Sequence, residues 1–343
     1  MVDGSSRKRT VRGRKIRADR ERKESRRARK KLARTASKVT ASERTGDRPL
    51  ESPDEVRPEP FVETDAVVEV RDRIDGWLEA AQPVHLIGPT GCGKTALALS
   101  AAAQRGRPVV WLNGDDAVDT AALVGAHAGG ERYEEHDRFV GGVNKKTQIV
   151  RERWVDNPLS VAVGEGATLV YNEFSRSNPA AHNVLLSVFE EGVLERPGKR
   201  GEDRTIDVHP EFRAIVTSND VEYAGVHRQQ DALLDRFVGV HVGYYDGETE
   251  GEIVRAHVDL SDESVEAVVE TTRTLREELE IVVGTRAAIT AAKGLAVFDD
   301  DDDGGQFDDD LLAEVFTDVL SPKTASEDAE SIDELRSTIT EAV

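Results

Sequence analysis

Apolar positions between residues 61 and 245 follow two patterns that alternate along the chain. Short apolar runs of strand length are separated by longer segments in which apolar residues recur at helical spacing. The runs that predict strands are 84–87, 108–113, 168–171, 212–217 and 236–242. The segments that predict helices are 67–78, 96–103, 120–123 and 179–191. Strands that alternate with helices predict an α/β fold, with a parallel sheet covered by helices on both faces.

The pattern changes on both sides of this region. From Glu248 onward only helical spacing appears, which predicts a smaller all-helical domain. Four prolines within 49–62 predict an extended linker. We therefore expect an arm and linker at 1–60, the α/β core at 61–245, and helices with an acidic C-terminal region at 246–343.

One segment inside the core has neither period. Residues 125–142 are rich in glycine and charged side chains, and their apolar positions are irregular. We interpret this segment as an inserted loop or hairpin.

The first apolar run leads directly into a glycine-rich motif and then into a helix. Residues 88–95 match G-x-x-x-x-G-K-[ST], the phosphate loop, in its required place between strand and helix. Backbone N–H groups must turn inward around a polyphosphate, and side chains would obstruct that turn. This requirement explains why three positions of the loop are glycine. The helix N-terminus adds further N–H groups and the positive end of its dipole. The expected ATP-binding residues are Gly88, Pro89, Thr90, Gly91, Cys92, Gly93, Lys94 and Thr95.

Within that loop two side chains have chemical roles. Lys94 is expected to reach the β- and γ-phosphates as a mobile charge. Thr95 is expected to supply a hydroxyl to Mg²⁺. Cys92 is the only cysteine in the chain, and we interpret it as a small filler whose backbone N–H does the binding.

Hydrolysis needs a metal ligand, a group that orients water, and positive charge on the γ-phosphate. The strand 168–171 ends in Asn172 and Glu173, where an acidic pair is expected. Glu173 is the candidate to orient or deprotonate the attacking water. Asn172 would hold a metal-bound water without adding charge, which predicts weaker Mg²⁺ binding or slower turnover. Asn219, after the strand 212–217, would position the water, although Ser218 and Asn219 also suit a plain turn.

Two arginines are candidates for stabilising the transition state. Arg236 lies just before the last strand and would reach a neighbour's γ-phosphate in a ring, or else form a surface ion pair. Arg286 opens a helix of the second domain and would fold back onto the phosphates.

Composition restricts where the protein works. The first 48 residues carry 19 basic and 6 acidic side chains, a net charge of +13, and the remainder carries −33. An acidic, lysine-poor surface is typical of adaptation to strong salt. The chain contains no run of about 18 apolar residues, so no membrane helix is predicted. No secretory signal is recognised at the N-terminus. A single cysteine fits a reducing interior, so we expect a cytoplasmic protein that does not enter membranes.

The basic arm 1–48 has almost no apolar residues and is expected to be disordered. It suits an acidic protein partner, or the acidic body of its own chain. It contains no aromatic residues, so nucleic acid is the less favoured partner. The acidic run 299–303 resembles half of a calcium loop, but Asp310 stands where glutamate is required, so we interpret it as a solvated loop. Histidine spacing and the single cysteine exclude a zinc cluster.

Taken in order, the phosphate loop and the segments 171–177, 185–192, 217–219, 233–237 and 284–286 resemble the AAA+ ATPases of the MoxR-like group. Within that group they are most similar to the gas vesicle protein N family. The resemblance covers roughly residues 61–298 and does not extend to the basic arm.

This resemblance implies a five-stranded core sheet, a helical lid and a homo-oligomeric ring. It implies that Asn172 and Glu173 form the second acidic motif, Asn219 the first sensor, Arg236 the finger acting in trans and Arg286 the lid sensor. It also implies a hairpin at 192–207 and another insertion at 125–142 that faces the pore or a client. The implied task is ATP-driven assistance in assembling gas vesicles, with vesicle structural or accessory proteins as partners.

Three other functions remain open from the sequence. The first is a MoxR-like chaperone that inserts a cofactor or metal into another client. The second is a nucleotide-dependent scaffold or switch in which Asn172 weakens hydrolysis. The third is a nucleic-acid motor that uses the basic arm.

Overall fold

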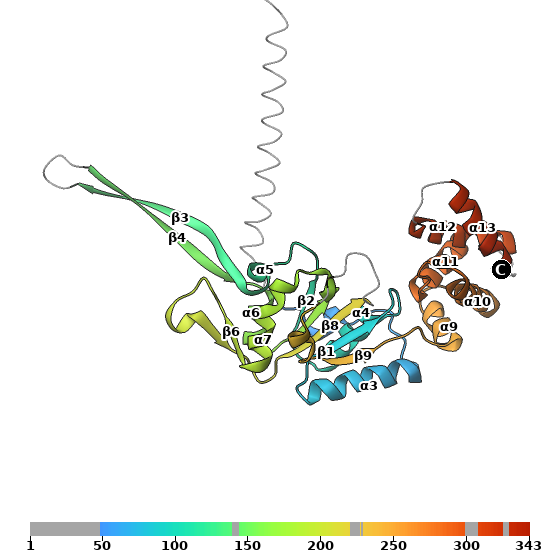
Figure 1. The fold of residues 1–343 in the computed structure, drawn as a ribbon, viewed down its shortest axis with the longest axis horizontal. Coiled ribbons are helices and arrows are strands. Elements are labelled where there is room, and N and C mark those ends of the chain that lie inside the picture. The colour runs from blue at the N-terminus through green and yellow to red at the C-terminus, as the bar shows by residue number, and fades with distance from the viewer. Residues whose placement is uncertain (1–48, 139–143, 220–226, 228, 299–307, 325–328) are drawn as a thin grey trace, which may run out of the picture. The chain divides into compact units, whose positions relative to one another are not determined.

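Five parallel strands form the central sheet in the order β2-β5-β8-β1-β9 (Figure 1). Their bounds are β1 Val84–Gly88, β2 Val109–Asn113, β5 Thr168–Asn172, β8 Arg213–Asn219 and β9 Val238–His241. The computed structural model describes residues 49–138, 144–219, 227, 229–298, 308–324 and 329–343. The basic arm 1–48 lies outside the described residues, as does the acidic run 299–303.

Side chains of each strand alternate between two apolar layers. Leu86, Val170 and Ile215 pack with helices α3 (Asp65–Glu79) and α4 (Lys94–Gln104) on one face. Leu169, Tyr171 and Val216 pack on the other face with α5 (Thr120–Val124), α6 (Pro158–Glu165), α7 (Asn183–Glu190) and α8 (Asp231–Leu234). Burial on both faces explains why these strands are almost continuously apolar in sequence. The α/β prediction is confirmed.

Two elements differ from the sequence prediction at their ends. The predicted helix 179–191 begins with a 3₁₀ turn, η2 (Pro179–His182), before α7. The strand predicted to end at residue 217 continues through Asn219, which pairs with Gly88. The turn interpretation of Ser218 and Asn219 is therefore wrong, because both residues belong to β8.

The predicted linker 49–62 is only partly extended. Glu51 forms an antiparallel bridge with Val109 at the free edge of β2. Ser52 caps the short helix α2 (Pro53–Val56) with a reciprocal capping box, and Val56 is buried against the α3–α4 layer. The bridge, buried Val56 and the partly buried Leu50 and Phe61 hold this segment to the core, and the proline spacing revealed none of these contacts.

Two hairpins interrupt the core. β3 (Gly125–Arg138) pairs with β4 (Asn144–Asp156) as an antiparallel ribbon separate from the main sheet (Figure 1). The expected insertion is thus a hairpin and continues beyond residue 142. β6 (Val193–Glu195) pairs with β7 (Thr205–Asp207), as the family resemblance implies, and the 3₁₀ turn η3 (Gly201–Arg204) lies between them.

The base of the β3–β4 ribbon contacts the turn between β6 and β7. Trp154 packs edge-on against His127 with ring centroids 5.2 Å apart, and its Nε1 donates to Asp156 Oδ1 at 2.7 Å. His127 Nε2 donates to the carbonyl oxygen of Gly198 at 2.9 Å, in the turn between β6 and β7. A Cβ on Gly198 would lie 2.0 Å from Trp154 Cζ3, so only glycine admits the indole here. We call Trp154, His127, Asp156 and Gly198 the hairpin clamp.

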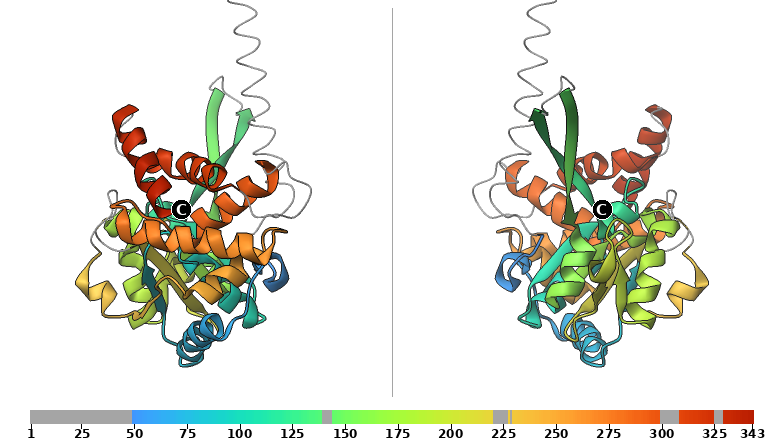
Figure 2. Two further views of the ribbon diagram at one scale, coloured as in Figure 1. Left: turned by 90° about the vertical axis from the view of Figure 1, so that its right-hand side faces the viewer. Right: turned by 90° about the vertical axis from the view of Figure 1, so that its left-hand side faces the viewer.

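The C-terminal helices form a separate apolar cluster, as predicted. They are α9 (Gly247–Arg255), α10 (Asp262–Glu278), α11 (Thr285–Phe298), α12 (Asp309–Leu320) and α13 (Ala329–Ala342), with the 3₁₀ turn η4 (Ser321–Lys323) after α12, and are orange to red in Figure 2. Their buried residues are mostly alanine, valine and leucine at helical spacing. Among the described residues, no helix is long and apolar enough to cross a membrane.

Candidate nucleotide site

The phosphate loop joins β1 to α4 with a backbone that requires glycine at three positions. Gly91 and Gly93 have φ of 83° and 94°, in the left-handed region that other residues rarely adopt. Gly88 has a different reason, because a Cβ there would lie 1.9 Å from the carbonyl oxygen of Val242. Gly88 is therefore required by the neighbouring backbone even without a phosphate, which the motif alone does not reveal.

Lys94 and Thr95 are the first two residues of α4. The Lys94 side chain is buried and its Nζ donates to the carbonyl oxygens of Gly88, at 2.9 Å, and Pro89, at 2.7 Å. These bonds hold the ammonium group over the preceding loop, where the motif requires a cation. The loop therefore combines left-handed glycines, a helix N-terminus and a positive charge, which together fit a polyphosphate.

Asn172 connects three elements at the carboxyl edge of the sheet. Its Oδ1 accepts hydrogen bonds from Thr95 Oγ1 at 2.7 Å and from Thr217 Oγ1 at 2.9 Å. Its Nδ2 donates to Asn113 Oδ1 at 2.8 Å, at the end of the neighbouring strand β2. The amide thus faces the hydroxyl of the phosphate loop with its oxygen.

Glu173 and Asn219 lie together at the ends of β5 and β8. The Glu173 backbone is left-handed, with φ of 54°, which is uncommon outside glycine. Its N–H donates to Thr217 Oγ1 at 3.2 Å, and its carboxylate accepts a long bond from Asn219 Nδ2 at 3.4 Å. Non-glycine residues in this conformation cluster at functional sites, where the surroundings impose the backbone. The left-handed turn directs the chain from β5 straight into the 3₁₀ turn η1 (Phe174–Arg176).

Arg286 lies at the phosphate loop from the side of the C-terminal helices. Gly284 packs so closely that a Cβ on it would meet the carbonyl oxygen of Thr90 at 2.6 Å. A cavity of about 500 Å³ is lined by Thr90, Gly91 and Arg286, together with Lys323. Burial, followed by the charge of Arg286, lowers the pKa of Lys323. Sequence analysis missed Lys323, because its only local context is the short Ser-Pro-Lys turn after α12.

A second cavity, of about 400 Å³, borders Gly91 and Gly93 and is largely apolar. Its walls come from the segment 58–62, from Tyr245, from Ile253 of α9 and His257 just after it, and from Ile289 of α11. An apolar hollow beside a phosphate loop suits the base and sugar of a nucleotide. The residues that line this cavity were not predicted from the sequence either, because they come from separate parts of the chain and share no motif.

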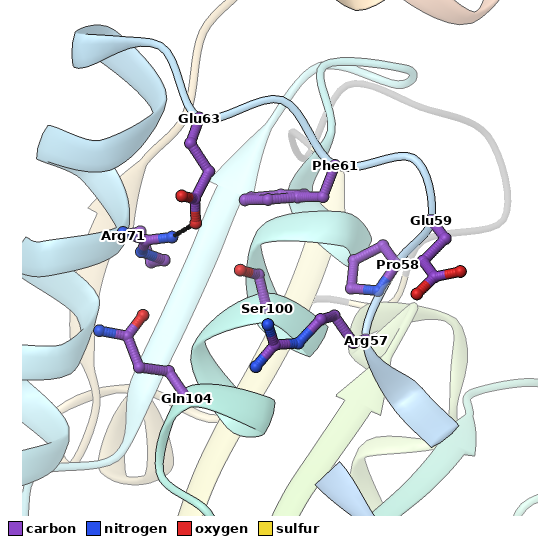
Figure 3. Close-up of a pocket in the computed structure, with 8 residues that line it drawn as sticks. All are labelled: Arg57, Pro58, Glu59, Phe61, Glu63, Arg71, Ser100 and Gln104. Atoms are coloured by element: carbon purple, nitrogen blue, oxygen red, sulfur yellow. Dashed lines mark hydrogen bonds and ion pairs between the residues drawn. The ribbon is translucent and has the colours of Figure 1, made fainter. Parts of the chain in front are cut away.

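The segment 57–63 also lines a third cavity, of about 690 Å³. Figure 3 shows Glu63 and Arg71 pointing toward each other, with Ser100 and Gln104 of α4 below them. Arg57 and Glu59 come from the segment itself. Pro58, Glu59 and Phe61 line both this cavity and the apolar cavity beside the phosphate loop.

Arg236 is not part of this constellation. It follows α8, its side chain is 42% exposed, and it forms an ion pair with Glu190 at the end of α7. The surface ion pair considered from the sequence is thus present. The structure brings together Lys94, Asn172, Glu173 and Asn219 with the phosphate loop, and Arg286 beside them, but leaves Arg236 on the exposed surface.

No cluster of three or more histidine, cysteine, aspartate or glutamate side chains that suits a metal ion occurs in the part of the chain that the structure describes. The calcium interpretation of 299–310 falls mainly on residues outside that part.

Comparisons with known proteins agree with this geometry. The model of the AAA domain (dynein-related subfamily) matches residues 83–237, which include the phosphate loop, β5 and β8. The gas vesicle ATPase GvpN2 of Halobacterium salinarum is 56% identical over 344 residues, 99% of this chain and 97% of that protein. The gas vesicle ATPase GvpN of Haloferax mediterranei is 54% identical, over 98% of each chain. The chain belongs to the gas vesicle ATPase family.

The fold of this gas vesicle ATPase family member also has solved counterparts. NtrX from Brucella abortus, solved in complex with ADP, is 18% identical and aligns with a TM-score of 0.52 over 90% of this chain and 65% of that one. This likeness concerns the fold alone. Together with the AAA domain and the identity to named ATPases, the phosphate loop makes the chain a P-loop ATPase that binds and hydrolyses ATP.

Proposed function

We propose that this protein is an AAA+ remodelling factor that uses ATP hydrolysis to help assemble gas vesicles. The observation that carries the proposal is identity above 50%, over nearly the whole chain, to two proteins named gas vesicle ATPase. The clients in this proposal are vesicle structural or accessory proteins, and the protein works in the cytoplasm at the vesicle. The two hairpins are the proposed client-facing elements, since neither contributes a strand to the ATPase sheet.

In this proposal each residue of the site has one task. Lys94 neutralises the β- and γ-phosphates, and Glu173 orients or deprotonates the attacking water. Asn219, which contacts the Glu173 carboxylate, positions the same water. Arg286 acts in cis, as supported by its place beside Gly91, and the exposed Arg236 acts on a neighbouring subunit's nucleotide in a ring.

The residues present also fit Mg²⁺. Mg²⁺ prefers oxygen ligands and keeps several of its waters. Thr95 Oγ1 and Asn172 Oδ1 are oxygens 2.7 Å apart at the mouth of the phosphate loop, and both would hold the ion or its water. When bound, the ion supplies charge neutralisation at the phosphates. Neither oxygen carries a formal charge, so we expect binding in the nucleotide complex and little binding to the protein alone.

Measuring phosphate release by Glu173→Gln tests the catalytic assignment. We expect a loss of about 100-fold or more, with nucleotide affinity retained, because the amide cannot accept the proton. Glu191→Gln is the matched control, since Glu191 is exposed after α7. Unchanged phosphate release in Glu173→Gln would overturn the assignment.

A second experiment tests the cellular task. The wild-type gene and Glu173→Gln are introduced into cells that carry a gas vesicle cluster lacking its own ATPase gene, and vesicles are counted by electron microscopy. We expect vesicles with the wild type and few or none with Glu173→Gln. Equal vesicle numbers with both genes would exclude an ATP-driven assembly role while leaving the ATPase assignment intact.

A further inference from the structure

Asn172 stands where an acidic metal-side residue is expected, and the structure shows a partner for it. That partner is Asn113, the last residue of β2, which pairs with Asn172 in the sheet register. Asn113 Oδ1 accepts a hydrogen bond from Asn172 Nδ2 at 2.8 Å. Asn113 is exposed and contacts neither the phosphate loop nor Glu173 through any hydrogen bond recorded among the described residues.

The orientation of the Asn172 amide is chemically important because its two ends differ. An amide oxygen binds a cation or its water, whereas an amide NH₂ repels a cation. A carboxylate is symmetric and has no wrong orientation. An asparagine at this position therefore needs something that keeps its oxygen toward Thr95.

Two neighbours supply that constraint from opposite sides. The backbone N–H of Glu173 can only donate, and it donates to Thr217 Oγ1 at 3.2 Å. This bond uses a lone pair of Thr217 and leaves its hydroxyl hydrogen for Asn172 Oδ1, at 2.9 Å. On the other side, Asn113 Oδ1 accepts from the NH₂ group. Rotating the Asn172 amide by half a turn would place oxygen against oxygen at Asn113 unless the Asn113 amide turned with it, so the pair can only change orientation together.

We propose that Asn113 is a positioning residue that holds the Asn172 carbonyl oxygen toward Thr95 and the magnesium site. It acts through Asn172 and does not touch the nucleotide. Asn113 and Asn172 thus replace a single carboxylate by an oriented amide, which preserves the ligand oxygen but not its charge. This inference rests on the proposed assignment of Thr95 and Asn172 to Mg²⁺.

The test measures binding without turnover. The affinity for a non-hydrolysable ATP analogue (AMP-PNP) is measured by calorimetry with Mg²⁺ and with EDTA, and the ratio of the two affinities is the readout. We expect Asn113→Ala to lower that ratio at least threefold, while the affinity in EDTA stays at the wild-type value. Asn113→Asp keeps an acceptor for Asn172 Nδ2, so we expect it to retain the wild-type ratio or exceed it.

A double-mutant cycle makes the test specific. In an Asn172→Asp background the carboxylate has no orientation to lose, so adding Asn113→Ala should leave the Mg²⁺ ratio unchanged. An equal effect of Asn113→Ala in both backgrounds would overturn the positioning role, as would an equal loss of affinity with Mg²⁺ and EDTA. If wild-type affinity does not depend on Mg²⁺ at all, the magnesium assignment itself fails. Thermal unfolding of each variant checks that the fold is retained.

Discussion

At the scale of single residues, Asp75 on α3 carries the clearest electrostatic cost. Neither carboxylate oxygen has a hydrogen-bond partner among the described residues. Burial raises the pKa of Asp75 to about 6, against the opposing charge of Arg71. The folded protein therefore binds a proton more tightly than the unfolded chain does. Ionised Asp75 therefore lowers the free energy of unfolding. This loss is absent below pH 3.8, grows as the pH rises to about 6, and is complete above that.

We predict that Asp75→Asn raises the thermal unfolding midpoint at pH 7.5 and has no such effect near pH 4. Removing a charge that burial disfavours is the physical reason. Differential scanning fluorimetry across this pH range checks the prediction. Glu69→Gln, an exposed carboxylate on the same helix, is the control and should change the midpoint little at either pH. A gain for Asp75→Asn that is independent of pH would contradict the electrostatic explanation.

Residue patterns predicted part of the site and not the rest, for a physical reason. Lys94 was predictable from the phosphate-loop motif. Glu173 and Asn219 were predictable because they stand at or just after the carboxyl ends of apolar strands, which parallel pairing brings to one edge. Asn113 ends such a strand too, but its role depends on a cross-strand partner. Tyr245, His257 and Lys323 contribute through packing between distant segments, which periodicity does not encode. The five strands followed from burial on both faces, whereas α6 was not predicted, because its apolar residues do not gather on one face.

At the scale of elements, one buried carboxylate holds the first C-terminal helices together. Glu250 on α9 is 1% exposed and receives Arg276 Nη2 at 2.8 Å and Thr285 Oγ1 at 2.6 Å. Arg276 also lies over the ring of Tyr244, 3.9 Å from its centroid. Thr285 precedes Arg286, so the same network fixes the start of α11 beside the phosphate loop.

We predict that Glu250→Ala destabilises the protein by about 3 kcal/mol, because it leaves the charge of Arg276 half-buried without its partner. Urea unfolding monitored by circular dichroism checks the value. Glu252→Ala, exposed on the same helix, is the matched control and should cost well under about 1 kcal/mol. A cost for Glu250→Ala no larger than that of the control would show that the network adds little.

The hairpin clamp gives a second prediction at this scale. Gly198→Ala would force Trp154 out of its place, because the new methyl group and the indole ring overlap. We predict faster cleavage within 125–156 in limited proteolysis and a loss of about 1–3 kcal/mol in stability. Gly76→Ala is the control, since its Cβ meets nothing within 4 Å in α3 and should stabilise the helix slightly. Wild-type cleavage of Gly198→Ala would show that the clamp does not restrain the ribbon.

At the scale of the whole molecule, the exposed position of Arg236 makes it possible to distinguish a site completed within one subunit from a site completed by a neighbouring subunit. If Arg236 serves a neighbouring subunit, Arg236→Ala carries an intact nucleotide site, and Lys94→Ala carries an intact arginine. We predict that each variant alone releases little phosphate and that mixing them restores part of the activity, because mixed rings contain complete sites.

The matched control mixes Lys94→Ala with Glu173→Gln. Both changes lie at the same site of one chain, so no interface in the mixture gains a complete set. Restoration in the first mixture and not in the second supports a ring with Arg236 in trans. Lack of restoration in both, at protein concentrations where size measurements show an oligomer, would remove the trans role.

The single cysteine of the chain lies inside the phosphate loop. Cys92 is 2% exposed, and its Sγ donates to the carbonyl oxygen of Val242 at 3.4 Å, the residue that also crowds Gly88. A thiol reagent can therefore react with Cys92 only when the phosphate loop separates from Val242, just after β9. The rate at which Cys92 is labelled therefore measures how often the phosphate loop opens. No engineered probe is needed, and the chain has no other thiol that would compete for the reagent.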